Sequence, residues 1–306
     1  MATASAGAAA SGCLSGAATG RFDESLSVFV SDLHVGGTNA TFDYTRERLV
    51  RVVDEILAMR PLPRRVVCFG DVALTYGLAA DYAVSKPILQ WLVDAGIDLH
   101  LTAGNHDRRS DFLKCWPSLA ESPLVPGRFT QVVSLGEADL ILLDTLKGAD
   151  DRGETDMGPV EGTLDPAQLS WFERFVAEAK RPFLVGSHHF RDLRIDGEPP
   201  IVRAAKSRHF AGWIYGHEHV WCPDLSVSSW AKNLISPTLS LPSTGLWGDI
   251  GYILFRTSSE GATAELVQSD FYFQTPVAPE ARPRAWDVRL AENRNKTVTF
   301  AFNGRR

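Results

Sequence analysis

The chain has 306 residues, 44% of them hydrophobic and 22% charged, and carries a formal net charge of −6 at pH 7. This ordinary globular composition predicts a sizeable buried core. The negative charge argues against a general affinity for nucleic acid or anionic membranes. The four cysteines lack CxxC spacing, so they form neither a thiolate metal motif nor an evident disulfide framework. No segment has the apolar length that a transmembrane helix needs.

Residues 1–22 are predicted to be a flexible N-terminal segment. The first twenty are mostly Ala, Gly, Ser and Thr with almost no charge, so they cannot hold a packed core. The sequence Ala-Ser-Gly-Cys at residues 10–13 is similar to a lipoprotein cleavage site, but the basic start and long apolar stretch of an export signal are missing. This segment fits either a truncated export signal or a plain flexible tail. The protein could accordingly be exported or cytoplasmic.

The first predicted strand leads into a short polar motif. Residues 26–30 form an apolar run typical of a buried strand, and Ser-Asp-Leu-His follows directly at residues 31–34. In an extended segment, side chains two residues apart point to the same side. Asp32 and His34 are therefore expected to reach one cation together, while Leu33 packs away from it.

The next elements repeat this pattern of an apolar strand followed by polar residues. Residues 42–59 have the spacing of an amphipathic helix, which two following prolines end. Strands are predicted at residues 66–69 and 97–102, with a helix at 88–95 between them. The motifs that follow these two strands are Gly-Asp at residues 70–71 and Gly-Asn-His-Asp at residues 104–107.

The middle of the chain continues the alternation of strands and helices. A strand over residues 140–143 ends at Asp144. Asp165 is a good N-cap with proline at the first helical position, which predicts a helix over residues 166–180. Residues 147–162 are polar, acidic and Gly-rich, and long for a connection inside a compact domain, so a substrate-facing loop and a disordered excursion both fit.

Two further apolar strands precede the last histidine motifs. Residues 183–185 lead into Gly-Ser-His-His at residues 186–189, and residues 213–215 lead into Gly-His-Glu-His at residues 216–219. The chain then closes with predicted strands at residues 252–255, 264–267 and 298–302.

Every motif follows a predicted strand within one to three residues. Strands alternating with helices indicate an α/β sheet, in which ligand sites collect at the carboxyl ends of the strands. Histidine and aspartate gathered at these ends predict a metal site. A domain boundary between the motifs would divide that site, so residues 23–306 are predicted to form one domain. His100 and His209 fall outside the pattern and are expected to be structural.

The order Asp-x-His, Gly-Asp, Gly-Asn-His-Asp, His and Gly-His-x-His resembles the calcineurin-like metallophosphoesterase family, over roughly residues 26–220. The resemblance implies an α/β fold of the four-layer αββα type, with two packed mixed β-sheets flanked by helices. Gly-Asp is not followed by a second acidic residue up to Gly77, and Gly-Asn-His-Asp stands in place of Gly-Asn-His-Glu. Both departures argue against the protein serine/threonine phosphatase branch. The pattern is closer to bacterial cyclic-nucleotide phosphodiesterase-like members.

The same resemblance implies two metal ions that share one carboxylate and a bridging solvent hydroxide. The implied ligands are Asp32, His34, Asp71 and His219 for the first ion, and Asp71, Asn105, His188 and His217 for the second. Nitrogen and oxygen ligands without thiolate suit Mn, Fe or Zn. Because His188 and His189 are adjacent, only one is expected to face the metals. The family pattern favours His188, and His189 stays open.

Residues beside Asn105 receive roles from this resemblance as well. His106 would lie over the substrate phosphate without binding metal, where it stabilises charge and assists the leaving oxygen. Asp107 would orient the His106 imidazole. Arg108 and Arg109 fit either a grip on a second phosphate oxygen or a solvated helix start.

Together these features predict a dinuclear-metal-dependent hydrolase of a small phosphate ester, with phosphodiesters favoured over phosphomonoesters. A nuclease of the same fold is an alternative, against which the lack of a basic excess argues. A catalytically silent metal- or phosphate-binding protein is another, against which the complete ligand set and His106 argue. The sequence does not indicate an oligomeric state.

Overall fold

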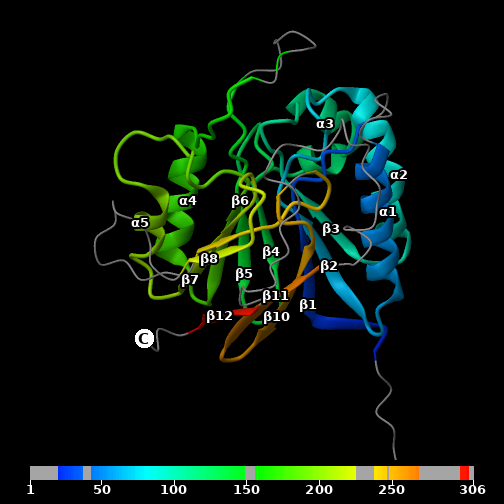
Figure 1. Ribbon diagram of the computed structural model, residues 1–306. Coiled ribbons are helices and arrows are strands. Elements are labelled where there is room, and N and C mark those ends of the chain that lie inside the picture. The colour runs from blue at the N-terminus through cyan, green and yellow to red at the C-terminus, as the bar shows by residue number, and fades with distance from the viewer. Residues whose placement is uncertain are drawn as a thin grey trace, which may run out of the picture.

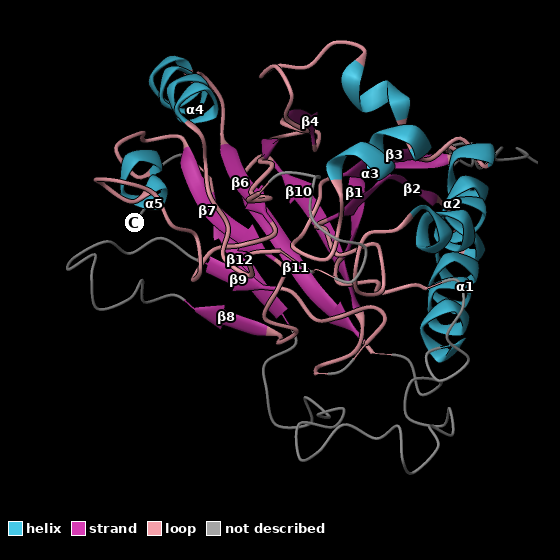
Figure 2. Cartoon of the chain, turned by 90° about the horizontal axis from the view of Figure 1, so that it is seen from above, coloured by secondary structure: helices cyan, strands magenta, loops and turns pink. Residues whose placement is uncertain are grey.

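The computed structural model describes residues 20–36, 43–148, 156, 158–224, 238–246, 248–268 and 297–302. Two six-stranded β-sheets pack face to face, with helices on their outer sides (Figure 1). The view from above separates α1, α2 and α3 on one side from α4 and α5 on the other, with the strands between them (Figure 2). This arrangement confirms the predicted α/β sandwich. The N-terminal segment predicted to be flexible lies outside the described residues up to residue 19.

The first sheet mixes parallel and antiparallel strands. In order across the sheet its strands are β12 (Thr297–Ala301), β11 (Gly261–Val267), β10 (Tyr252–Ser258), β1 (Phe22–Val30), β2 (Leu62–Cys68) and β3 (Asp98–Leu101). β1, β2 and β3 are parallel, whereas β10 pairs with β1 in the antiparallel sense. The predicted C-terminal strands therefore complete the sheet that begins with β1.

The second sheet is largely parallel. In order across the sheet its strands are β4 (Gln131–Ser134), β5 (Asp139–Leu142), β6 (Phe183–Ser187), β7 (Phe210–Tyr215), β9 (Thr238–Ser240) and β8 (Cys222–Asp224). β5, β6, β7 and β9 run parallel, so their carboxyl ends lie at one edge. The His-His and Gly-His-Glu-His motifs follow β6 and β7 at this edge.

Alternating side chains of β1 divide the core into two layers. Val28 and Val30 pack into the cluster beneath α1 and α2, whereas Phe29 points into the layer between the two sheets. The Phe29 ring lies 4.7 Å from the ring of Phe255 and 5.2 Å from that of Phe69, centroid to centroid. Successive side chains of a strand point to opposite faces, so β1 packs against the helices on one face and against the other sheet on the other.

The helices agree with the predicted pattern in part. They are α1 (Asp43–Ala58), α2 (Ala79–Asp94), α3 (Arg109–Cys115), α4 (Pro166–Glu178) and α5 (Pro200–Ala204). The Asp165 carboxylate accepts a hydrogen bond from the Gln168 backbone N–H, which confirms the predicted N-cap. α2 begins nine residues before the predicted start, with Pro87 inside it; buried Tyr82 and Ser85 hold this first half of the helix.

Candidate metal centre

Five of the seven predicted ligands have an unusual backbone conformation. The non-glycine residues with positive φ in the described part of the chain are Asp32 (53°), His34 (47°), Asp71 (51°), His217 (71°) and His219 (53°). This left-handed conformation costs an L-residue about 1–2 kcal/mol. Such strained residues cluster at functional sites. The backbone thus independently marks the residues that the motifs select.

Asp32 and His34 meet the end of β2 directly. The Asp32 N–H donates to the Gly70 carbonyl oxygen and the His34 N–H to that of Asp71, both at 3.0 Å. The predicted extended conformation is wrong here, because this turn places both residues in the left-handed region. Their side chains nevertheless lie together: Nε2 of His219 is 3.2 Å from Asp32 Oδ1 and 3.2 Å from His34 Nε2.

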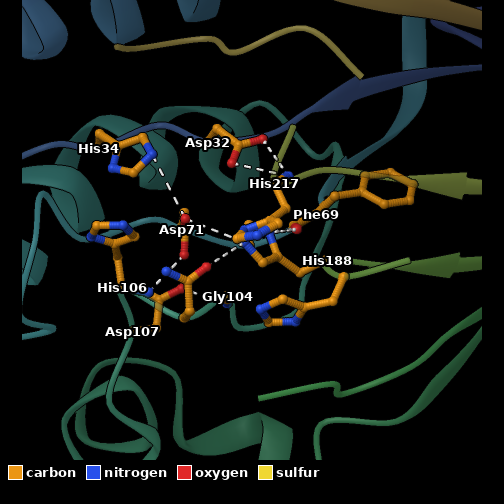
Figure 3. Close-up of polar contacts among 12 residues, drawn as sticks. Asp32, His34, Phe69, Asp71, Gly104, His106, Asp107, His188 and His217 are labelled. Carbon is orange, nitrogen blue, oxygen red and sulfur yellow. Dashed lines mark hydrogen bonds and ion pairs between the residues drawn. The ribbon is translucent and has the colours of Figure 1, made fainter. Parts of the chain in front are cut away.

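Asp71 lies between the two groups of predicted ligands (Figure 3). Its Oδ2 is 3.7 Å from His34 Nε2 on one side and 3.2 Å from His188 Nε2 on the other. Its Oδ1 accepts a hydrogen bond of 2.8 Å from the His106 backbone N–H. A Cβ atom on Gly104 would lie 2.1 Å from this oxygen, so the glycine of the Gly-Asn-His-Asp motif makes room for the carboxylate.

His188 presents Nε2 to the centre. Its Nδ1 lies 2.8 Å from the Phe69 carbonyl oxygen, which can only accept a hydrogen bond, so Nδ1 carries the proton. Nε2 then lies 3.1 Å from Asn105 Oδ1. It also faces Asp71 (Figure 3). The structure therefore brings His188 together with the other predicted ligands of the second ion. His189 is fully buried beside it.

His217 is held by two carboxylates. Its backbone N–H lies 3.2 Å from both oxygens of Asp32, and its Nε2 lies 3.5 Å from Asp192 Oδ2. A carboxylate on one imidazole nitrogen orients the ring for a metal on the other nitrogen. Sequence reasoning missed Asp192, although it stands only three residues after His189.

The predicted contact between Asp107 and the His106 ring is wrong. His106 Nδ1 lies instead 3.0 Å from the Thr75 carbonyl oxygen. The Asp107 carboxylate accepts hydrogen bonds from the N–H groups of Val72, Ala73 and Gly104 and from the Tyr82 hydroxyl. Burial and the charge of Asp71 raise the pKa of Asp107 to about 6. Asp107 thus joins the loops that follow β2 and β3.

The ionisable groups of the centre strongly shift one another's pKa values. Burial raises the pKa of Asp71, but His188 and His106 outweigh it and hold this pKa well below its usual range. Burial alone would lower the pKa of His188, yet Asp71 raises it to about 9. Burial and the charge of His106 lower the pKa of His34 to about 3, and burial beside His188 lowers that of His217. Neutral imidazoles are the form that binds metal, so the lowered pKa values of His34 and His217 favour binding, whereas His188 would release a proton when it binds.

Of the two readings of the arginine pair, a solvated helix start does not hold, because Arg108 is buried and Arg109 is only partly exposed. α3 does begin at Arg109, but its guanidinium holds both oxygens of Asp144 at 3.1 Å. Arg108 Nε donates to the Tyr76 carbonyl oxygen at 2.6 Å. Both arginines therefore fasten the start of α3 to neighbouring loops.

A loop after β9 supports Asp32 from the outside. The Ser243 hydroxyl donates to the Asp32 carbonyl oxygen at 2.9 Å, and the Gly245 N–H donates to the same oxygen at 3.1 Å. Buried Arg48 of α1 in turn donates to the carbonyl oxygens of Gly245 and Leu246 at 2.7 and 3.0 Å. α1 thus reaches the centre through this loop.

The assembled donors fit metal binding. Four groups of three residues in the described ranges have ligand atoms within 4.8 Å of one another: Asp32, His34 and His219; His34, Asp71 and His106; Asp32, Asp71 and His188; and His188, His189 and His217. Imidazole nitrogens and carboxylate oxygens are the donors expected for transition metals.

The sandwich fold and these clusters define an α/β protein with a candidate metal centre. A family model described as calcineurin-like phosphoesterase matches residues 27–221, more than half of the chain. The chain therefore belongs to the calcineurin-like phosphoesterase family, whose activity is metal-dependent phosphoester hydrolysis. No curated protein matches the chain significantly.

One solved structure supports the fold. A dimetal phosphatase from Danio rerio is similar with a TM-score of 0.61 and 14% identity, over 79% of this chain and 95% of that one. The sulfate thiohydrolase SoxB of Thermus thermophilus has a TM-score of 0.44 and 12% identity, over 79% of this chain and 56% of that one.

No helix in the described ranges is long and apolar enough to cross a membrane.

Proposed function

We propose that the chain is a dinuclear-metal-dependent phosphoesterase acting on a small phosphate ester. The position of Asp71 carries this proposal, because its carboxylate lies between His34 and His188 and can serve two ions at once. The proposed ligands are Asp32, His34, Asp71 and His219 for one ion, and Asp71, Asn105, His188 and His217 for the other.

Two such ions, of Mn, Fe or Zn, would supply the positive charge that binds the phosphate and activates the attacking water. The two aspartates balance only part of that charge, so the centre attracts an anionic ester although the chain is acidic overall. Contacts with neighbouring backbone and side-chain groups hold several of these donors in place. Asp192 and Asp32 fix His217, and the Phe69 carbonyl oxygen fixes His188.

His106 is the proposed catalytic group of the chain itself. Its Nδ1–H donates to the Thr75 carbonyl oxygen, which leaves Nε2 for a phosphate or leaving-group oxygen; Nε2 can donate to that oxygen when both ring nitrogens are protonated. Asp107 holds the loop that carries His106. The lack of a second acidic residue after Asp71 supports a substrate like those of the cyclic-nucleotide phosphodiesterase-like members, so we favour diesters over monoesters.

Metal-depleted protein supplied with Mn, Fe or Zn tests this function. Hydrolysis of bis-p-nitrophenyl phosphate, p-nitrophenyl phosphate and cyclic AMP would be measured beside the metal content. We expect about two ions per chain and faster turnover of the diesters. Absence of bound metal and of activity with every metal would contradict the proposal, and faster turnover of the monoester would contradict the preference for diesters.

A further inference from the structure

His189 has a buried ring nitrogen without a hydrogen-bond partner. Its Nε2 is shielded from solvent, and no donor or acceptor in the described residues meets it. Leaving such an atom unsatisfied costs roughly 1–3 kcal/mol. Buried polar atoms without a partner are rare and call for an explanation such as an ion.

The position of the His189 ring indicates that a bound cation could be the partner of Nε2. The His189 ring lies 4.7 Å from the ring of His188 and 4.8 Å from that of His217, centroid to centroid. One nitrogen from each of the three imidazoles lies within 4.8 Å of the others. Three imidazoles arranged in this way can hold a single cation.

The ring is also fixed from behind. Nδ1 lies 2.9 Å from Thr145 Oγ1, which already accepts a hydrogen bond of 3.2 Å from the His189 backbone N–H. A hydroxyl oxygen has two lone pairs, so it can accept from Nδ1–H as well, and Nε2 then carries the free lone pair. A Cβ atom on Gly162 would lie 2.5 Å from His189 Cγ, so only a glycine lets the backbone at residue 162 pack against the His189 ring.

We propose that His189 Nε2 is an additional ligand of the second ion, beside His188 and His217. The family pattern uses one histidine of this pair, whereas here both serve the centre. Three imidazoles favour Zn or Fe over Mn at this position, because carboxylate and water ligands suit Mn better. This ligand rests on the proposed two-metal function.

Cobalt binding to the metal-depleted protein tests the ligand without an activity assay. Co²⁺ would be titrated into the unaltered protein, His189→Ala and His189→Asn, with the visible spectrum recorded. Asparagine keeps a group near the Nδ1 position that can bond Thr145 but removes Nε2, so it tests the ligand if alanine impairs folding. His209→Ala is the matched control, since His209 precedes β7 at the end opposite to the histidine motif.

We expect both His189 variants to bind one Co²⁺ as the unaltered protein does and to bind the other at least about tenfold more weakly, with a changed spectrum. His209→Ala should bind both ions unchanged. If the unaltered protein binds two ions and His189→Asn matches it in affinity and spectrum, the additional ligand is refuted and the two-metal function stands. If the unaltered protein binds none, the proposed function itself fails.

Discussion

Three histidines around Asp71 share one arrangement of their ring nitrogens. In His34, His106 and His188, Nδ1 lies 3.0, 3.0 and 2.8 Å from the main-chain carbonyl oxygens of Leu74, Thr75 and Phe69, respectively. Because a carbonyl oxygen only accepts, each contact selects the same tautomer. Nε2 of each ring is left for ligands or substrate, so three main-chain oxygens of the one segment after β2 orient three imidazole rings.

Replacing Asp71 tests its shared position. Asp71→Ala should retain less metal than Asn105→Ala, because it removes a carboxylate proposed to serve both ions, whereas Asn105 gives one neutral oxygen to one ion. Elemental analysis of both purified variants gives the comparison. Equal metal content in the two variants would show that Asp71 does not bridge.

Replacing His106 separates catalysis from metal binding. His106→Ala should keep the fold and both ions but lose activity by about 100- to 10,000-fold, as expected for a positioned acid. The loss should be larger for an ester with an alkyl alcohol, which needs a proton to leave, than for p-nitrophenolate. Equal losses would restrict His106 to phosphate binding, and loss of metal would make it a ligand.

The motifs predicted which donor residues come together, but not the groups that hold them. Each histidine and aspartate of the four donor groups lies in a motif that follows an apolar strand, which is why the sequence could point to them. The partner of His106 was predicted wrongly, since the Thr75 carbonyl oxygen belongs to a loop whose path no local pattern sets. Asp192 was missed for the same reason, because only the folded loop brings it to His217.

At the scale of elements, length and hydrophobicity decided which predictions succeeded. The second half of β1, with β6 and β7, consists of buried residues and was located, although β1 begins four residues and β7 three residues before the predicted start. The five-residue α5 and the short edge strands β4 and β8 were missed. Such short elements have little periodicity of their own and depend on neighbouring contacts.

The contact between α1 and the loop after β9 can be tested through Arg48. Arg48→Met keeps an apolar stem but removes the hydrogen bonds to Gly245 and Leu246. Hydrogen bonds to charged groups are worth roughly 1.5–3 kcal/mol each, so urea denaturation should show a clear loss of stability. Metal affinity should fall too, because this loop holds Asp32. Arg51→Met, on the exposed face of α1, is the control and should change little; equal effects would argue against the contact.

At the scale of the molecule, the centre joins parts of the chain that are far apart in sequence. Its proposed ligands run from Asp32 to His219 and follow strands of both sheets. A cation bound there would link the two sheets directly, beside the aromatic layer of Phe29, Phe69 and Phe255. Folding and metal binding should therefore be coupled.

Removal of metal tests this coupling. Chelation should lower the melting temperature, since an ion that binds only the folded state adds about 2.7 kcal/mol at a concentration of 100 times its Kd. Differential scanning calorimetry with and without chelator gives the shift. Asp71→Ala should show little or no shift. An unchanged melting temperature in the unaltered protein, with metal shown to be lost, would mean that the centre does not stabilise the fold.

The left-handed residues of the centre set stability against activity. At Asp32, His34, Asp71, His217 and His219, glycine would adopt the observed backbone without the cost that any other L-residue carries. A screen of the metal-free protein for heat resistance alone should therefore enrich glycine at these positions. Each glycine variant selected in this way would lack a proposed ligand. The most heat-resistant metal-free variants should therefore have the lowest activity.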